Sequence, residues 1–96
     1  MMDALVIIPT YNEKENIVRI IDAVMHQDYP FEVLIIDDGS PDGTAEIVEG
    51  LIGKYEGRLH IEKRKGKLGL GTAYIHGFKW ALARQYNYVF EMDADF

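Results

Sequence analysis

Two acidic side chains with the spacing of a metal site stand near the end of the sequence, at Asp93 and Asp95. They follow an apolar run. On an extended or turning segment, residues i and i+2 project to the same side, so both carboxylates can face one cation. Mg²⁺ and Mn²⁺ usually take only one or two protein carboxylates and complete their shell with water and substrate phosphates. Bridging a diphosphate, such an ion stabilises the charge on a departing nucleoside diphosphate. The alternative is a solvated turn.

A second pair of carboxylates, Asp37 and Asp38, follows another apolar run and opens the turn-rich segment 37–43. Aspartate, glycine, serine and proline are turn formers, and Asp42 or Thr44 is in position to cap a following helix. Two adjacent carboxylates exceed what a cap needs. Acidic residues at this place in doubly wound folds accept hydrogen bonds from ribose hydroxyls. The pair is therefore a candidate for contact with a base or a ribose.

A glycine-rich loop at 66–71 resembles loops that cradle phosphate at the start of a helix. The dinucleotide fingerprint Gly-x-Gly-x-x-Gly is not met, because Gly69 and Gly71 are followed by Tyr74 in place of the third glycine. Four of the ten basic residues lie in or next to this loop, at Lys63, Arg64, Lys65 and Lys67. They are suited to attract a phosphate-bearing substrate or an anionic membrane surface. A solvated basic loop is the alternative.

Apolar segments between these polar ones predict four strands and three helices. The predicted strands occupy residues 4–8, 31–36, 58–63 and 88–92. The first is a continuous apolar run and the second is apolar except at Glu32, both typical of buried strands, and the third alternates like an edge strand. The first helix is predicted to begin at Asn12, whose spacing to Glu15 is that of a capping box. The second ends near Gly57, and the third runs from about Thr72 to Arg84.

The alternation of strands and helices is typical of right-handed βαβ crossovers. It predicts an α/β fold with a Rossmann-like parallel sheet in the order β-α-β-α-β-α-β, within one domain over residues 1–96. The carboxyl ends of parallel strands meet at one edge, where ligands bind. Acidic groups from three segments gather there, and their mutual repulsion favours a divalent cation between them. Glu91 interrupts the apolar last strand and has no assigned role.

Composition excludes several classes of protein. The chain has 96 residues, of which 48% are hydrophobic and 27% charged, as in ordinary globular domains. The longest apolar run, 4–9, is far shorter than the about 20 residues of a membrane-spanning helix. With no cysteine, disulfides and thiolate metal or redox sites are excluded. A net charge of -6 and a pI of about 4.9 argue against nucleic acid as a partner.

Four segments together resemble a known family: residues 7–13 (IIPTYNE), 36–44 (IDDGSPDGT), 69–77 (GLGTAYIHG) and 92–95 (MDAD). They are similar to the dolichyl- or polyprenyl-phosphate mannosyltransferases, a branch of the inverting family 2 glycosyltransferases with the GT-A fold. The first and last segments are shared across many family 2 enzymes. The middle two point to the polyprenyl-phosphate branch. The resemblance covers essentially the whole chain and implies the nucleotide-binding half of a GT-A fold.

The resemblance also implies a reaction. Mannose moves from GDP-mannose to polyprenyl or dolichyl phosphate with inversion, and Mg²⁺ or Mn²⁺ steadies the leaving diphosphate. The implied nucleotide-sugar site consists of Pro9, Tyr11 and Glu13 around the nucleotide, Ile36 and Asp38 near the base and ribose, and Asp93, Ala94 and Asp95 at the diphosphate. Of these residues, Asp93 and Asp95 are the implied metal ligands. No catalytic base is assigned.

Family members continue past the Asp-x-Asp motif with a further metal ligand, basic groups for the phosphates and the acceptor surface. The sequence is therefore expected to be the N-terminal part of such an enzyme, truncated after the motif, which binds nucleotide weakly and does not turn over. An uncovered apolar face is expected to permit self-association. The full-length protein is expected at the cytoplasmic face of a membrane, with peripheral membrane contact.

Three alternatives differ in class. A receiver-like phosphoacceptor module places its acidic pair after the first strand, whereas here the pair follows the second predicted strand. A non-catalytic nucleotide-sugar-binding module fits the same motifs without turnover. Another family 2 glycosyltransferase that uses a UDP-sugar also fits, because the sequence does not separate GDP-mannose from other donors.

Overall fold

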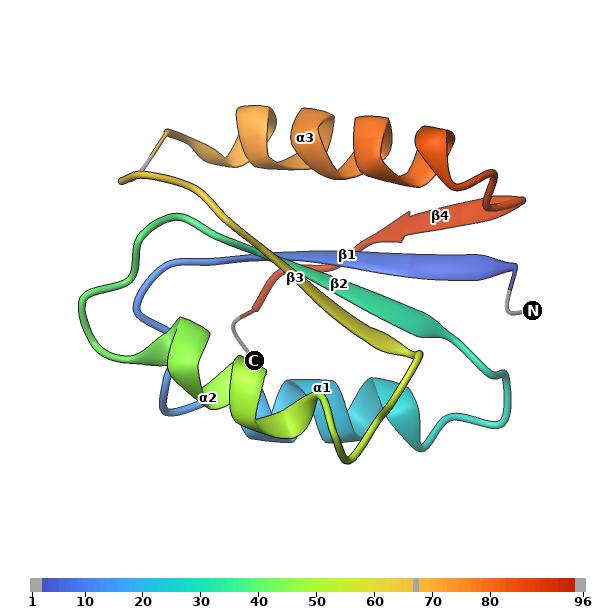
Figure 1. Ribbon diagram of the computed structural model, residues 1–96, viewed down its shortest axis with the longest axis horizontal. Helices are drawn as coiled ribbons and strands as arrows, with labels where there is room; N and C mark the ends of the chain where they lie inside the picture. Colours follow the sequence, from blue (N-terminus) through green and yellow to red (C-terminus); the bar gives the residue numbers. More distant parts are fainter. Residues whose placement is uncertain (1–2, 67, 95–96) are drawn as a thin grey trace.

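Four parallel strands form one sheet in the order β3-β2-β1-β4 in the computed structural model, which describes residues 3–66 and 68–94. The strands are β1 (Ala4–Thr10), β2 (Glu32–Asp37), β3 (Leu59–Lys63) and β4 (Tyr88–Glu91). The helices between them are α1 (Ile17–Met25), α2 (Thr44–Leu51) and α3 (Leu70–Ala83). Helices α1 and α2 cover one face of the sheet and α3 covers the other (Figure 1). The predicted order β-α-β-α-β-α-β is confirmed.

The two central strands are buried on both faces, because successive side chains of a strand point to opposite sides. The side chains that face α1 and α2 are Val6, Ile8, Val33 and Ile35. Those that face α3 are Leu5, Ile7, Leu34 and Ile36. All eight are buried. The predicted edge position of β3 is also confirmed, since β3 pairs with β2 alone among the described strands.

Small residues let α3 lie close to the sheet. Ala73, Gly77 and Ala81 recur at four-residue spacing along the buried side of the helix. A Cβ atom built on Gly77 would stand 2.7 Å from the Cγ2 atom of Ile7, which is closer than carbon atoms approach in real proteins. The larger Ile75 side chain on the same helix is 54% exposed. The closest approach of α3 to the sheet is therefore made at its small residues.

The first helix begins four residues later than predicted: its N-cap is Asn16, not Asn12, and its first residue is Ile17. Asn12 does not cap it. The residue takes the left-handed conformation, with φ of 56°, and its backbone N–H donates a hydrogen bond to the Ser40 hydroxyl at 2.9 Å. Asparagine tolerates this conformation better than most residues do. Asn12 thus turns the chain out of β1, and the helix begins one turn further on.

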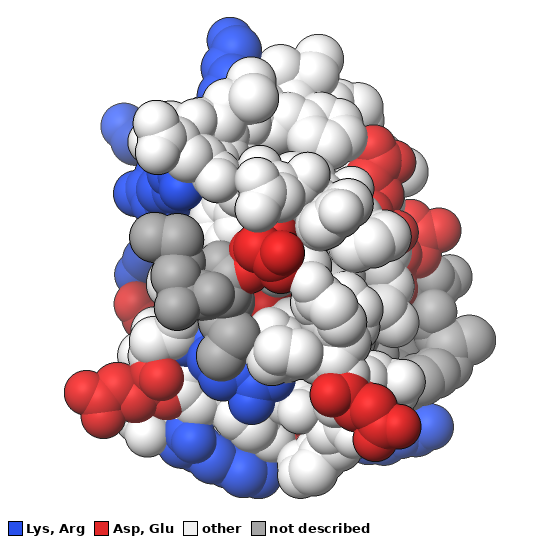
Figure 2. Space-filling view, turned by 90° about the vertical axis from the view of Figure 1, so that its right-hand side faces the viewer, with Lys and Arg blue, Asp and Glu red and all other residues white. Residues whose placement is uncertain are grey.

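Strand β4 lies at the other edge of the sheet and pairs with β1 alone among the described strands. Tyr88 and Phe90 on this strand are 58% and 48% exposed. Glu91 is exposed as well, which accounts for a charged residue in this strand. Tyr29 and Phe31 pack beside them, with a distance of 5.8 Å between the ring centroids of Phe31 and Phe90. Figure 2 shows the end of the molecule where the strands begin, with acidic atoms near the centre and uncharged residues around most of them.

No helix in the described part of the chain, residues 3–66 and 68–94, has the length and hydropathy that crossing a membrane requires.

We predict that Gly77→Ala destabilises the fold. The added methyl group clashes with Ile7, and overpacking of this kind costs about 1–3 kcal/mol, against a gain of up to about 1 kcal/mol in helix propensity. Chemical denaturation measures the free energy of unfolding. Gly50→Ala in α2 is the control, because no atom lies within 4 Å of the new Cβ there, so this variant gains stability. Equal stability of the two variants would contradict the packing argument.

Candidate functional site

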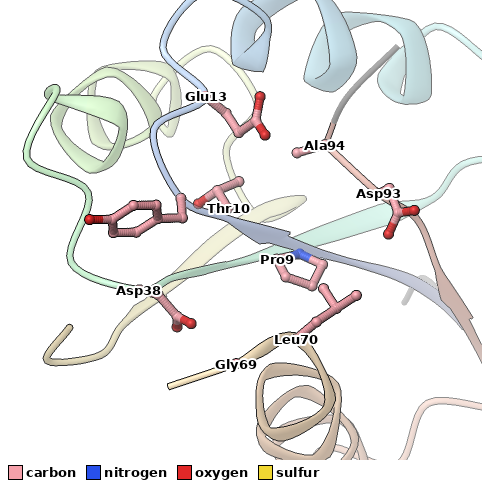
Figure 3. Close-up of a pocket in the computed structure, with 9 residues that line it drawn as sticks. Pro9, Thr10, Glu13, Asp38, Gly69, Leu70, Asp93 and Ala94 are labelled. Atoms are coloured by element: carbon pink, nitrogen blue, oxygen red, sulfur yellow. The ribbon is translucent and has the colours of Figure 1, made fainter. Parts of the chain in front are cut away.

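A pocket of about 340 Å³ opens at the carboxyl ends of β1, β2 and β4 (Figure 3). Its volume lies within the range of about 300–1,000 Å³ that is usual for small-molecule sites. The register places Thr10 beside Asp37, so β1 and β2 end level with each other at this edge. The residues that line the pocket are Pro9, Thr10, Tyr11, Glu13, Asp38, Gly69, Leu70, Asp93 and Ala94.

Most of the residues predicted for the nucleotide-sugar site line this pocket: Pro9, Tyr11, Glu13, Asp38, Asp93 and Ala94. The side chain of Ile36 does not, because it is fully buried in the core between the sheet and α3. Asp95, the second predicted metal ligand, lies outside the described residues. Gly69 and Leu70 line the pocket although they were not among the predicted site residues.

Side chains of the loop after β2 hold the backbone of the loop after β1. The backbone N–H of Asn12 donates to the Ser40 hydroxyl at 2.9 Å, and that of Glu13 donates to the Thr44 hydroxyl at 3.0 Å. These two bonds fix the segment that carries Tyr11 and Glu13 at the pocket. Two loops that are far apart in sequence therefore form one wall.

The adjacent carboxylates of Asp37 and Asp38 have different surroundings. Asp37 is 1% exposed and accepts hydrogen bonds from the Thr10 hydroxyl at 2.7 Å and from the backbone and hydroxyl of Ser40 at 3.0 and 2.6 Å. It shapes the turn and does not line the pocket. Asp38 does line it, and its carboxylate forms two hydrogen bonds with the Arg64 guanidinium, at 2.6 and 2.8 Å.

Asp42 stabilises the start of α2, although the N-cap residue of this helix is Gly43 and not Asp42 or Thr44 as the sequence predicted. Its carboxylate accepts a hydrogen bond from the backbone N–H of Thr44, the first residue of α2, at 3.0 Å. It also accepts one from the backbone N–H of Lys14 at 3.1 Å, which adds a third link between the two loops. Asp42 is therefore part of the scaffold of the pocket.

Asp93 stands on the opposite side of the pocket from Asp38 (Figure 3). The Tyr74 hydroxyl on α3 donates a hydrogen bond to the Asp93 carboxylate at 3.0 Å. Burial, this hydrogen bond and the negative charges of Asp93 and Glu91 raise the pKa of Tyr74 to about 12. Helical spacing alone does not show that the end of the Tyr74 side chain reaches Asp93.

A divalent metal fits the donor chemistry on the Asp93 side. The Asp93 carboxylate is exposed, and Mg²⁺ and Mn²⁺ accept a site of one or two carboxylates completed by water and phosphate oxygens. Within residues 3–66 and 68–94, no group of three or more His, Asp or Glu side chains is arranged around a common point. Among the described residues, a metal at Asp93 would therefore need water or phosphate oxygens of a ligand to complete its coordination.

Comparison with known proteins identifies the family. The model of the family described as "Glycosyl transferase family 2" matches residues 5–96. Polyprenol monophosphomannose synthase of Mycolicibacterium smegmatis is 48% identical over 95% of this chain, and undecaprenyl-phosphate mannosyltransferase of Micrococcus luteus is 45% identical over 98%. The matches span 34% and 38% of those two proteins, so the chain covers little more than a third of their length.

Solved structures with the same fold include complexes with two different nucleotide sugars. The mannosyltransferase PcManGT from Pyrobaculum calidifontis, in complex with GDP-Man and Mn²⁺, matches 82% of this chain and 24% of its own, with a TM-score of 0.77 and 30% identity. TarS 1-349 from S. aureus, in complex with UDP-GlcNAc, matches 98% of this chain and 27% of its own, with a TM-score of 0.82 and 31% identity. The family match over nearly the whole sequence and these neighbours lead to one conclusion: the chain belongs to glycosyl transferase family 2.

Proposed function

We propose that this chain is the nucleotide-sugar-binding part of an inverting glycosyltransferase that transfers mannose from GDP-mannose to polyprenyl or dolichyl phosphate. The observation that carries the proposal is the pocket at the strand ends, which gathers Tyr11, Asp38 and Asp93 in a chain 48% identical to a polyprenol monophosphomannose synthase. The names of the two curated relatives support mannose and the lipid phosphate. The complex of PcManGT with GDP-Man supports the nucleotide.

Each side of the pocket has a role in this reaction. Pro9 and Tyr11 contact the nucleotide, and Asp38 accepts a hydrogen bond from its base or ribose. Asp93, together with Asp95, would hold a divalent ion, which would supply positive charge to stabilise the leaving diphosphate. The complex of PcManGT with Mn²⁺ supports this ion.

The acceptor supplies its own nucleophile. An oxygen of the lipid phosphate attacks the anomeric carbon on the face opposite the diphosphate, the bond from that carbon to the diphosphate oxygen breaks, and GDP leaves with the electron pair. One displacement inverts the anomeric centre. Because a phosphate oxygen is already anionic at neutral pH, the attack does not require a base from this chain.

The proposed acceptor also bears on where the protein acts. A polyprenyl chain lies in a membrane, so we infer that the full-length protein works at the cytoplasmic face of one, through peripheral contact. The exposed Tyr88 and Phe90 on the β4 edge support contact with another protein surface, including a second copy.

A UDP-sugar donor is the second candidate for the function, supported by the complex of TarS with UDP-GlcNAc.

We predict that the chain binds GDP in the presence of Mn²⁺ and that Asp93→Asn weakens this binding by about tenfold or more, because the ion loses a charged ligand. Isothermal calorimetry with GDP and with UDP, each with and without Mn²⁺, measures both effects. Asp28→Asn, at an exposed position away from the pocket, is the matched control and leaves the affinity unchanged. Tighter binding of UDP than of GDP would favour the second candidate, and binding that is indifferent to Mn²⁺ would exclude the proposed ion.

We predict that Tyr74 titrates with a pKa of about 12 in the folded protein. The difference in ultraviolet phenolate absorbance between the wild type and Tyr74→Phe isolates this residue from the other tyrosines. The folded pKa of Tyr74 lies above the usual value of about 10, so the protonated hydroxyl favours the folded state. Its contribution to the free energy of unfolding is complete below pH about 10 and is lost as the pH rises through about 12. Asp93→Asn lowers the pKa of Tyr74, because a hydrogen bond to an anion is removed. An unchanged titration in that variant would show that Tyr74 and Asp93 are not in contact.

A further inference from the structure

One ion pair is buried directly behind the pocket. The Arg64 Nε and Nη2 atoms donate to the two carboxylate oxygens of Asp38 at 2.6 and 2.8 Å, and each side chain is only 8% exposed. Paired parallel hydrogen bonds between a guanidinium and a carboxylate are strong and fix the orientation of both groups. Removal of one partner would leave a buried charge without compensation. The basic cluster of the sequence thus contains one arginine that is not a solvated cation.

Arg64 also contacts the segment that begins α3. Its guanidinium donates to the Gly69 carbonyl oxygen at 3.3 Å and to the Thr72 hydroxyl at 3.2 Å. The backbone N–H of Leu68 donates to the Asp38 carboxylate at 3.3 Å. Asp38 and Gly69 line the pocket, whereas Arg64 is not among the lining residues. Arg64 therefore joins two walls of the pocket from behind.

The backbone brings these walls unusually close. A Cβ atom built on Gly39, whose φ is +72°, would stand 2.7 Å from the backbone nitrogen of Gly66. In addition, the backbone N–H of Arg64 donates to the Asp37 carbonyl oxygen at 2.7 Å. The loop after β2 and the loop after β3 are thus in direct backbone contact beside the ion pair. Only glycine at position 39 permits this approach.

The hydrogen bonds limit what Asp38 can offer a ligand. An ionised carboxylate has about four acceptor positions, and Arg64 and the Leu68 amide occupy three of them. One position, on Oδ1, is left for a ligand in the pocket that Asp38 lines. It suits a single hydroxyl or ring N–H donor of a nucleotide.

We propose that Arg64 is a positioning residue of the nucleotide site: it orients Asp38 for one hydrogen bond to the base or ribose and holds the first turn of α3 against the loop after β2. The guanidinium acts through Asp38 and Gly69 and does not touch the donor. The part of this inference that concerns the donor rests on the proposed function. The part that concerns the two walls rests on the contacts alone.

The test compares Arg64→Gln with Arg84→Gln, the same change at the far end of α3, where the arginine is exposed and stacks on Trp80. Amide hydrogen exchange reports on the walls without any ligand. We expect amide exchange at Leu68 and Ala73 to be about tenfold faster in Arg64→Gln and unchanged in Arg84→Gln. The reason is that losing about one to two kcal/mol of hydrogen bonding raises the equilibrium constant for local opening by about tenfold. Unchanged exchange in both variants overturns the proposal.

Affinity for GDP with Mn²⁺ separates positioning from a structural role. We expect Arg64→Gln to weaken binding about tenfold and Arg64→Lys, which keeps the charge but loses the paired geometry, to be intermediate. Added to Asp38→Asn, Arg64→Gln should weaken binding by no more than about twofold, since its partner is already altered. Full additivity of the two changes would overturn the indirect role.

The role of Arg64 can still be tested if Arg64→Gln does not fold or if the wild type does not bind GDP. Where Arg64→Gln does not fold, the variant with both Arg64→Gln and Asp38→Asn, which removes both buried charges, takes its place in the exchange measurement. There, protection at Ala73 equal to that of the wild type would contradict the proposal. Where the wild type does not bind GDP, the proposed function fails, and hydrogen exchange alone decides the role of Arg64.

Discussion

Because the side chains of β1 and β2 are apolar in both directions, helices must cover both faces of the sheet, and the rest of the architecture follows from that requirement. Each strand has to be followed by a crossover helix, so every loop that leaves a strand emerges at the same edge. Polar residues in those loops are brought together even though they are distant in sequence. The pocket is a consequence of how the core is covered, and the residues that line it come from the ends of β1, β2 and β4 and from the start of α3.

The acidic side chains at this edge of the sheet differ in their partners. Asp37 and Asp42 accept hydrogen bonds from neighbouring backbone and hydroxyl groups and serve the loops, and Asp38 is neutralised by Arg64. Glu13 and Asp93 are the lining carboxylates for which the structure gives no cationic side-chain partner among the described residues. Among the described lining residues, the acidic charge without a cationic side-chain partner therefore lies at Glu13 and Asp93, whereas the charge of Asp38 is compensated.

Sequence patterns predicted what depends on local chemistry. Continuous apolar runs identified β1 and β2, and turn-forming residues identified the loops, because strand burial and turn conformation leave direct traces in residue type. Contacts between segments that are distant in sequence could not be predicted from residue type. Three features depend on which segments meet in space. Arg64 is buried, Tyr74 contacts Asp93, and the Ile36 side chain lies in the core and not in the pocket. Asn12 was misread for a related reason: its left-handed conformation is stabilised by Ser40, 28 residues away.

The position of β4 has a thermodynamic consequence. This strand has four residues, lies at an edge and carries exposed aromatic side chains, whereas β1 and β2 lie in the interior. Short edge elements open at a lower free energy than the global unfolding of a domain. The segment that presents Asp93 follows this strand, so the two sides of the pocket differ in local stability. If an ion and a diphosphate bind at Asp93 as proposed, their binding would favour the paired state of β4, and part of the binding free energy would appear as increased protection of that strand.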